Sequence, residues 1–277
     1  MATERQVNEL QILSPKSMNK ISFEESSRTI YVVLPCYNEQ DNLISLFGEF
    51  ERIFDHIKNL GLKHKYIVVD DGSKDNSFNI LTNIGQSVDL EIIQHNPNQG
   101  LGMTIKDGFK RASERMDDRD IVVTMDSDNT QPAALLFSMV LKILEGNHVV
   151  IASRYRYGAK VVGLNAFRTF LSYGAGLLFK FSYNIKDVKD YTCGYRAYDG
   201  SILKRAFNHY GENFIEQKGF QCMAEILLKL HKLDKNIIFS EVPMVLRYDL
   251  KQGESKMKVA DTIFNTIKML ITYKFRK

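Results

Sequence analysis

Two carboxylates, two residues apart, follow a short apolar run near the middle of the chain. Residues 121–124 favour β-structure, and Asp126 and Asp128 come shortly after them, ahead of Pro132. Side chains two apart on an extended chain point to the same side, so both carboxylates can face one cation. Hard oxygen ligands suit Mg²⁺ or Mn²⁺, which keep waters and bridge to substrate phosphates. Because an isolated D-x-D is also common in solvated turns, the surrounding elements must decide between the two interpretations.

Strands and helices are expected to alternate from residue 29 onward, since β-favouring runs are separated by segments with a 3.6-residue apolar period. This order predicts an α/β fold, with a mostly parallel sheet flanked by helices. Each of the first four expected strands ends in polar or glycine-containing sequence, and open parallel sheets bind ligands along that edge. The expected strands are 29–34, 66–69, 90–94, 121–124 and 148–152, and the expected helices include 43–60, 133–144, 218–233 and 257–274.

Residues after the first two strands have side chains suited to a nucleotide. Tyr37 can lie against a flat base or ribose, and Glu39 can accept hydrogen bonds from it. Asp70 can hold a base edge or a ribose hydroxyl; alternatively, Asp70 and Asp71 cap the following helix. The glycines of N-Q-G-L-G (98–102) match neither the dinucleotide-binding nor the P-loop pattern, which weighs against both enzyme classes and predicts a tight turn into a helix.

Composition narrows the class of protein. The 277 residues have the hydrophobic content of a globular protein, 44%, and the net charge of +4 is too weak and scattered to indicate nucleic-acid binding. The widely spaced Cys36, Cys193 and Cys222 suggest neither a metal site nor disulfides, which favours a reduced, cytoplasmic compartment. No apolar stretch of about 18 residues predicts a membrane-spanning helix, and early charges argue against a secretory signal.

The chain is expected to divide into three parts. Residues 1–28 form a polar leader, either disordered or a short amphipathic helix; residues 29–256 form one domain; and residues 257–277 form an amphipathic helix with a basic end. That helix can lie on an anionic membrane, on the domain, or on a second copy of the chain. The apolar segment 164–185, which includes Arg168 and Lys180, fits either a pair of interfacial helices or core packing.

Together, the motifs resemble family 2 glycosyltransferases of the GT-A (Rossmann-like) fold over about residues 30–258. The motifs that match the broad family are P-C-Y-N-E (35–39), V-D-D-G-S-K-D (69–75), N-Q-G-L-G (98–102), D-S-D (126–128) and S-R-Y (153–155). A later set resembles the dolichyl-phosphate mannose synthase branch, which charges a polyprenyl phosphate with a sugar: D-Y-T-C-G-Y-R-A-Y (190–198), K-G-F-Q-C-M-A-E (218–225) and G-E-S-K-M (253–257).

The resemblance implies a nucleotide-diphosphate sugar donor, a divalent metal (Mg²⁺ or Mn²⁺) on the D-x-D, and inversion at the anomeric carbon. The implied donor site comprises Pro35, Tyr37, Glu39, Asp70, Asp71, Asp126, Ser127, Asp128, Lys218 and Lys256. The family places a glutamine just beyond the D-x-D at the metal; here that position is Thr130, with Gln131 beside it, and Gln131 is assigned to the metal together with Asp126 and Asp128.

A family arginine in the donor site is missing. Its position is Leu250, and either Arg247 or Lys251 replaces it through a one-residue length change.

The acceptor determines whether the reaction needs a base. A hydroxyl acceptor must lose a proton to a positioned carboxylate or histidine, whereas a lipid phosphate is already ionised and needs cations. Arg154 and Arg168 match family positions that hold the acceptor phosphate, a task suited to Arg; exposed ion pairing is the alternative. Asp190 is expected to order the acceptor loop with Arg196, and it also remains a candidate base. Glu216 and Glu225 are further candidate bases, and the expected catalytic set is Asp128, Asp190, Arg154, Arg168 and Arg196.

The favoured function is an inverting, metal-dependent transfer of a hexose to a polyprenyl phosphate at the cytoplasmic face of a membrane. A family 2 enzyme acting on a saccharide hydroxyl is the first alternative, and a catalytically silent nucleotide-sugar-binding scaffold is the second. The residues do not distinguish GDP-mannose from UDP-glucose or UDP-N-acetylglucosamine as the donor.

Overall fold

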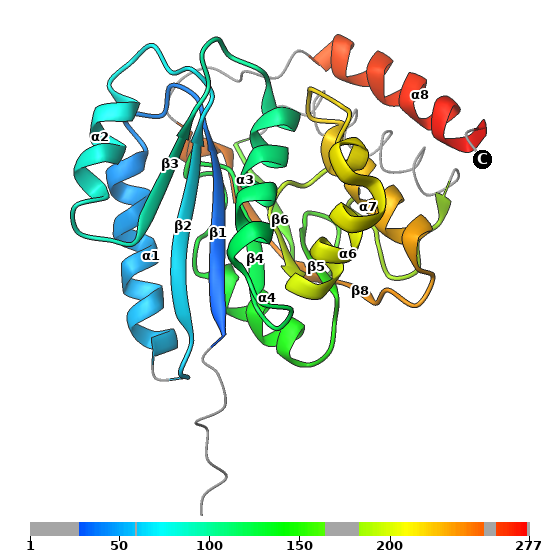
Figure 1. Cartoon of the computed structure of the whole chain (residues 1–277), viewed down its shortest axis with the longest axis horizontal. Helices are drawn as coiled ribbons and strands as arrows, with labels where there is room; N and C mark the ends of the chain where they lie inside the picture. Colours follow the sequence, from blue (N-terminus) through cyan, green and yellow to red (C-terminus); the bar gives the residue numbers. More distant parts are fainter. Residues whose placement is uncertain (1–27, 59, 164–182, 252–258, 276–277) are drawn as a thin grey trace, which may run out of the picture.

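A seven-stranded mixed sheet forms the centre of the computed structural model, which describes residues 28–58, 60–163, 183–251 and 259–275 (Figure 1). Its strand order is β3-β2-β1-β4-β7-β5-β8, and β7 alone runs antiparallel to its two neighbours. A second, two-stranded parallel sheet pairs β6 (Lys160–Val162) with β9 (Val245–Arg247). The strands of the large sheet are β1 (Thr29–Cys36), β2 (Lys63–Asp70), β3 (Leu90–Gln94), β4 (Ile121–Thr124), β5 (Val149–Ser153), β7 (Arg196–Asp199) and β8 (Phe239–Pro243).

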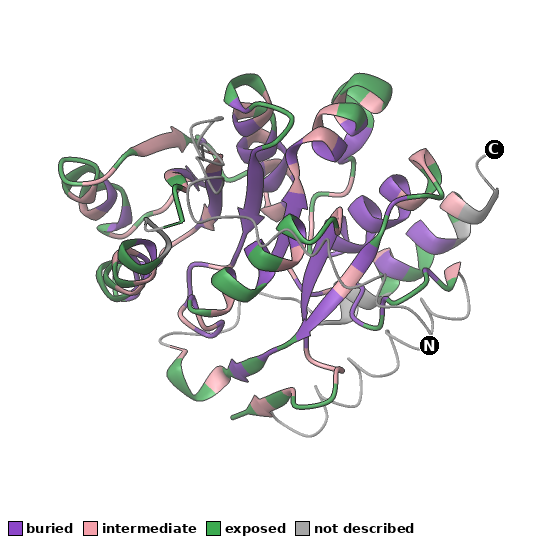
Figure 2. Cartoon of the chain, turned by 90° about the horizontal axis from the view of Figure 1, so that it is seen from below, coloured by how far each residue is buried: buried purple, intermediate pink, exposed green. Residues whose placement is uncertain are grey.

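Helices cover both faces of this sheet, as the sequence pattern predicted (Figure 2). One face carries α1 (Leu43–Lys58), α2 (Ser77–Ile84) and α4 (Leu135–Leu144); the other carries α3 (Leu101–Arg115), α6 (Gly200–Tyr210) and α7 (Cys222–Leu233). Side chains alternate between the two faces along each strand. On β2, Tyr66 therefore donates to Glu51 of α1 on one face, and Val69 faces α3 on the other. The connections include two 3-10 turns, Gly211–Phe214 and Tyr248–Leu250.

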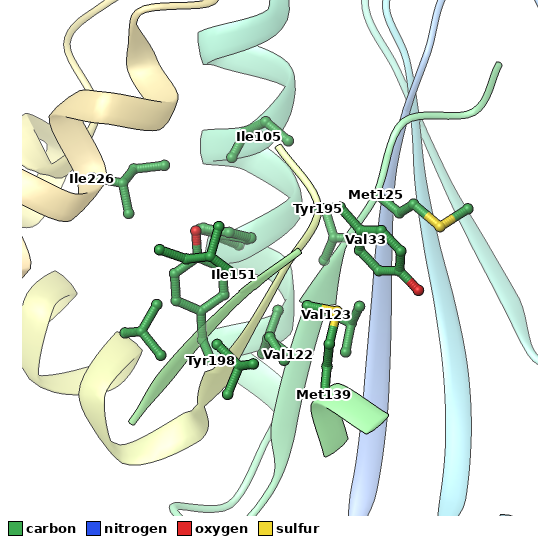
Figure 3. Packing of buried hydrophobic residues seen from close by; sticks show 14 of the residues in the cluster. Val33, Ile105, Val122, Val123, Met125, Met139, Ile151, Tyr195, Tyr198 and Ile226 are labelled. Carbon is green, nitrogen blue, oxygen red and sulfur yellow. The ribbon is translucent and has the colours of Figure 1, made fainter. Parts of the chain in front are cut away.

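The core is a pair of apolar layers separated by the sheet. On the α3 side, Phe109 and Tyr198 pack edge to face with ring centroids 5.2 Å apart, and Val122 lies beside Tyr198 (Figure 3). The absence of a side chain at Gly108 lets α3 approach β1, since a Cβ there would lie 2.4 Å from Cγ1 of Val33. Met139 of α4 lies near Val123 on the opposite side (Figure 3).

Register brings the polar strand ends together. Cys36 at the end of β1 pairs with Asp70 at the end of β2, and Asp70 pairs with Gln94 at the end of β3. Thr124 at the end of β4 pairs with Val33, near the same end of β1. The residues that follow these parallel strands therefore meet along one edge of the sheet.

The strand β7 is the main departure from the sequence expectation. Asp190 and Arg196 were expected to order an acceptor loop, and no strand was expected there, but Arg196–Asp199 is a buried strand between β4 and β5. A four-residue strand that contains Arg and Asp has too few alternating apolar positions to indicate burial on both faces.

The C-terminal helix α8 (Val259–Phe275) packs against the domain. Met269 and Leu270 are buried, and Tyr183 donates to the Leu270 carbonyl oxygen at 3.3 Å. Phe264 and Ile267 on the same helix are exposed. Of the three expected placements, the described residues take the one on the domain. Within the described ranges, no helix is long and apolar enough to span a bilayer. The leader (1–27) and most of the apolar segment (164–182) lie outside the described residues.

Candidate functional site

The acids Asp126 and Asp128 follow β4 and are held by different neighbours. Asp128 Oδ1 accepts hydrogen bonds from the Thr130 hydroxyl at 2.7 Å and the Thr130 N–H at 3.2 Å. Gln131 donates to Asp126 Oδ2 at 2.7 Å and accepts the Asp126 N–H at 3.0 Å. Thr130 and Gln131, the two candidates for the third metal position, thus contact different acids: Thr130 contacts Asp128 and Gln131 contacts Asp126.

A lysine ammonium lies against this pair of acids. Lys251 Nζ is 2.6 Å from Asp128 Oδ2, and both side chains are largely shielded from solvent. Arg247, the other candidate for the missing family arginine, instead forms an exposed ion pair with Asp249 at 2.7 Å. The geometry therefore favours Lys251 as the replacement, because its charge is at the site and that of Arg247 is directed elsewhere.

The pKa of Asp126 is raised, which indicates that nearby positive charge does not fully balance its carboxylate. Burial and the nearby charge of Asp128 raise the pKa of Asp126 to about 7, although Lys251 and Arg154 act in the opposite direction. Two carboxylates are hard oxygen ligands of the kind that Mg²⁺ or Mn²⁺ takes, and a bound ion would compete with the Lys251 ammonium for Asp128. Among the described residues, no cluster of three or more His, Cys, Asp or Glu is arranged to hold a metal. Any further ligands from outside such a cluster would be amide oxygens, waters or substrate phosphates.

A pocket of about 410 Å³ lies at the ends of β2 and β3, which β1 separates from β4 and the two acids. Tyr37, expected to contact the base or ribose, is on its wall, together with Ser73, Lys74, Gln94 and Asn98. The size and the mixture of an aromatic ring with amide and hydroxyl groups suit a nucleoside.

Asp70 and Asp71 have different tasks, and neither caps α2. Buried Asp70 accepts the Ser73 N–H at 3.1 Å and the Gln94 amide at 3.3 Å, which places it behind the pocket wall. Asp71 accepts the N–H groups of Gln99 at 2.8 Å and Gly100 at 2.9 Å, so it holds the 98–102 loop. The N-cap of α2 is Asn76, without a side-chain cap.

The remaining donor-site candidates have separate surroundings, where the structure describes them. Ser127 donates to the Pro35 carbonyl oxygen at 2.8 Å, which joins the ends of β4 and β1. Glu39 is nearly buried and accepts from Asn42 at 2.7 Å. Lys218 is exposed on the loop before α7, whereas Lys256 and Arg168 lie outside the described residues.

Asp190 and Arg154 form a buried ion pair. Arg154 donates through Nε at 2.8 Å and a terminal nitrogen at 2.6 Å to the two Asp190 oxygens, and its N–H also donates to Asp190. Burial alone would raise the pKa of Asp190, but the Arg154 charge and these hydrogen bonds outweigh it and hold that pKa below its usual value. Arg154 is near the metal candidates as well, since its charge acts on Asp126.

Arg196 holds the loop that begins at Asp190 through main-chain oxygens. Arg196 is fully buried in β7 and donates to the main-chain carbonyl oxygens of Tyr191, at 2.8 Å, and Met223, at 2.5 Å. Arg154 is the cation paired with Asp190, because it directly follows β5, next to the loop that carries Asp190. Arg196 thus braces the main chain in this structure, and its position does not support the catalytic role expected for it.

The sequence analysis did not anticipate the importance of Gly102. Its N–H donates to the Lys218 carbonyl oxygen at 2.8 Å, and a Cβ at this position would lie 1.7 Å from the Gln217 carbonyl oxygen. The glycine therefore allows the Lys218 loop to lie directly against the start of α3. The sequence signal for this close approach was the pair Gly100 and Gly102, on either side of the first residue of α3. The sequence analysis interpreted these glycines only as a tight turn.

Comparisons with known proteins match this architecture. The family model "Glycosyl transferase family 2" matches residues 31–211. A dolichol-phosphate mannosyltransferase of Pyrococcus furiosus is 29% identical over 86% of this chain and 62% of its own length. An undecaprenyl-phosphate 4-deoxy-4-formamido-L-arabinose transferase of Yersinia pseudotuberculosis is 30% identical over 70% of this chain and 56% of its own length. The chain thus spans less than two thirds of both relatives.

A solved structure shares the fold. The mannosyltransferase PcManGT of Pyrobaculum calidifontis, in complex with GDP-Man and Mn²⁺, superposes with a TM-score of 0.55 at 14% identity, over 90% of this chain and 64% of the other. The expected fold and the expected resemblance to polyprenyl-phosphate glycosyltransferases are confirmed. On these grounds the chain belongs to glycosyl transferase family 2.

Proposed function

We propose that this enzyme transfers a hexose, with inversion, from a nucleotide-diphosphate sugar to a polyprenyl phosphate at the cytoplasmic face of a membrane. The names of the two relatives, which specify dolichol and undecaprenyl phosphate, support this acceptor class. The pocket beside Tyr37 supports a nucleoside at one end of the site, and the acids after β4 support a diphosphate at the other.

The observation that carries the choice of acceptor is that all three candidate bases are engaged in the fold. Asp190 is fully buried and paired with Arg154. Glu225 is fully buried and accepts two main-chain N–H groups and Lys229. Glu216 is bonded to the same Lys229 at 2.9 Å. A hydroxyl acceptor needs a free base, whereas an ionised phosphate does not, so this arrangement favours a phosphate.

Each charged residue then has a task in the transfer. Asp126 and Asp128, with Gln131 beside them, would hold a divalent cation, and such an ion, when bound, supplies positive charge to the leaving diphosphate. Lys251 adds a fixed ammonium at the same acids, and Lys218 and Lys256 are assigned to the diphosphate as in the family pattern. Arg154, oriented by Asp190, and Arg168 are assigned to the acceptor phosphate.

Incubation with labelled nucleotide sugars, Mn²⁺ and a short-chain prenyl phosphate tests the proposal. We expect a chloroform-soluble labelled product with the anomeric configuration inverted, and none with the matching prenyl alcohol, which lacks the phosphate. Transfer to free saccharides in place of the lipid would instead identify a hydroxyl acceptor. A thermal-shift screen of GDP- and UDP-sugars, with and without Mn²⁺, identifies the donor, and the absence of both binding and turnover would favour a scaffold.

A further inference from the structure

The loop that carries Lys218 is held from two sides. On one side, Gly102 donates to the Lys218 carbonyl oxygen at 2.8 Å. On the other, the Glu225 carboxylate accepts the N–H of Glu216 at 3.0 Å and the N–H of Gln217 at 2.9 Å. These two amides immediately precede Lys218, so the main chain that leads to it has a defined path.

Glu225 is itself part of a buried charged cluster. It is fully buried in the first turn of α7, and a buried carboxylate needs compensating charge. Lys229, one turn later, supplies it by donating to Glu225 at 2.8 Å and Glu216 at 2.9 Å. The rings of Tyr210 and Tyr273 lie 5.8 Å and 5.4 Å from the same ammonium, where their faces attract a cation.

The last member of this cluster comes from the C-terminal helix. The Tyr273 hydroxyl of α8 is hydrogen-bonded to Glu225 and lies 3.0 Å from a Glu216 oxygen. A phenol has one proton to donate, so Tyr273 sits between two carboxylates and can serve either of them. Through this contact, α8 touches the carboxylate that fixes the Lys218 loop.

We propose that Glu225 and Tyr273 are positioning residues for Lys218, so that the contact of α8 with Glu225 through Tyr273 sets the geometry of the donor loop. This rests on the proposed function, in which Lys218 binds the donor diphosphate. The helix also begins eight residues after Lys251, which contacts Asp128. The helix α8 therefore follows the segment that carries Lys251, and through Tyr273 it holds the loop that carries Lys218.

Amide hydrogen exchange tests the link without requiring turnover. Tyr273→Phe keeps the ring over Lys229 but removes the hydroxyl, and we expect exchange at Glu216 and Gln217 to rise about tenfold. The matched control is Tyr183→Phe, which removes a different α8 contact, the bond to the Leu270 carbonyl oxygen, and should leave these two amides unchanged. Exchange in Tyr273→Phe equal to that of the parent protein overturns the proposal.

A double-mutant cycle tests whether the link acts through Lys218. We expect Tyr273→Phe to raise the KM for the donor severalfold while the KM for the prenyl phosphate stays constant, and Glu225→Gln to act in the same direction. In a Lys218→Met background, Tyr273→Phe should have no further effect on the donor KM, because the group it positions is gone. Fully additive effects would show that Tyr273 only anchors α8. If the parent protein transfers no sugar, the proposed function is contradicted. The exchange rates at Glu216 and Gln217 still test whether Tyr273 positions the Lys218 loop.

Discussion

Asp126 and Asp190 lie beside adjacent strands of one sheet, yet their electrostatic situations are opposite. Asp126 has a second carboxylate, Asp128, near it, and burial together with that charge raises its pKa to about 7. Asp190 is fully buried but has a bidentate arginine and three main-chain N–H donors, and its pKa is lowered. Arg154 balances the charge of Asp190 within the fold, whereas Lys251 pairs with Asp128 and the pKa of Asp126 remains raised. This contrast supports the proposal that Asp126 and Asp128 bind a ligand while Asp190 belongs to a structural ion pair.

The strongest test of the contrast is removal of Asp128. We expect Asp128→Ala to lower kcat by about 10²–10³-fold, because a group that gathers positive charge at the leaving diphosphate is lost. Initial rates at saturating donor and Mn²⁺ measure this effect. Asp118→Ala is the control, since that carboxylate is highly exposed and precedes β4, whereas Asp128 follows it. Unchanged turnover in Asp128→Ala would refute the metal assignment.

Breaking the internally balanced pair should instead cost stability. Arg154→Met leaves Asp190 buried without its cation, and we expect the free energy of unfolding to fall by about 3–5 kcal/mol. Removal of an exposed pair by Arg247→Ala should change it by less than about 1 kcal/mol. Urea denaturation of both variants makes the comparison. Similar small losses would mean that the Arg154 pair is no more structural than a surface contact.

Neutralising the two acids should shift stability in opposite directions. Without metal, Asp126→Asn removes a like-charge contact with Asp128 and should stabilise the fold by about 1 kcal/mol. Asp190→Asn removes the partner of Arg154 and should destabilise it by about 3 kcal/mol. Thermal denaturation in EDTA measures both. If both variants are destabilised, Asp126 is also a structural acid.

The pH dependence of stability should carry the signature of Asp190. Its pKa is lower in the folded state, so the folded protein binds fewer protons than the unfolded chain. The resulting stabilisation is fully present above the unfolded pKa of about 4 and disappears as pH falls through the folded value. We expect Asp190→Asn to flatten the stability profile as the pH falls from about 5 toward the acid limit. Denaturation series at fixed ionic strength provide the measurement, and an unchanged slope contradicts the assignment.

The sequence alone located the strand ends well because the signals there are local. Apolar runs and polar breaks predicted β1 to β5, and β3 was placed at Leu90–Gln94, as observed. The short strand β7 was missed because burial between two neighbours replaces the alternating pattern. Likewise, the tight approach of Gln217 to Gly102 depends on residues more than 100 positions away, which leave no local trace.

By itself, the sequence determined the family, the α/β order of elements and the pair of acids after β4, because each is encoded in contiguous residues whose period or spacing is visible. Only the tertiary structure decided which charges meet. Lys251 reaches Asp128 across 123 residues, and Arg154 reaches Asp190 across 36. An ion pair depends on where two chain segments meet in space, and the types of the residues alone did not show which lysine or arginine would meet these acids.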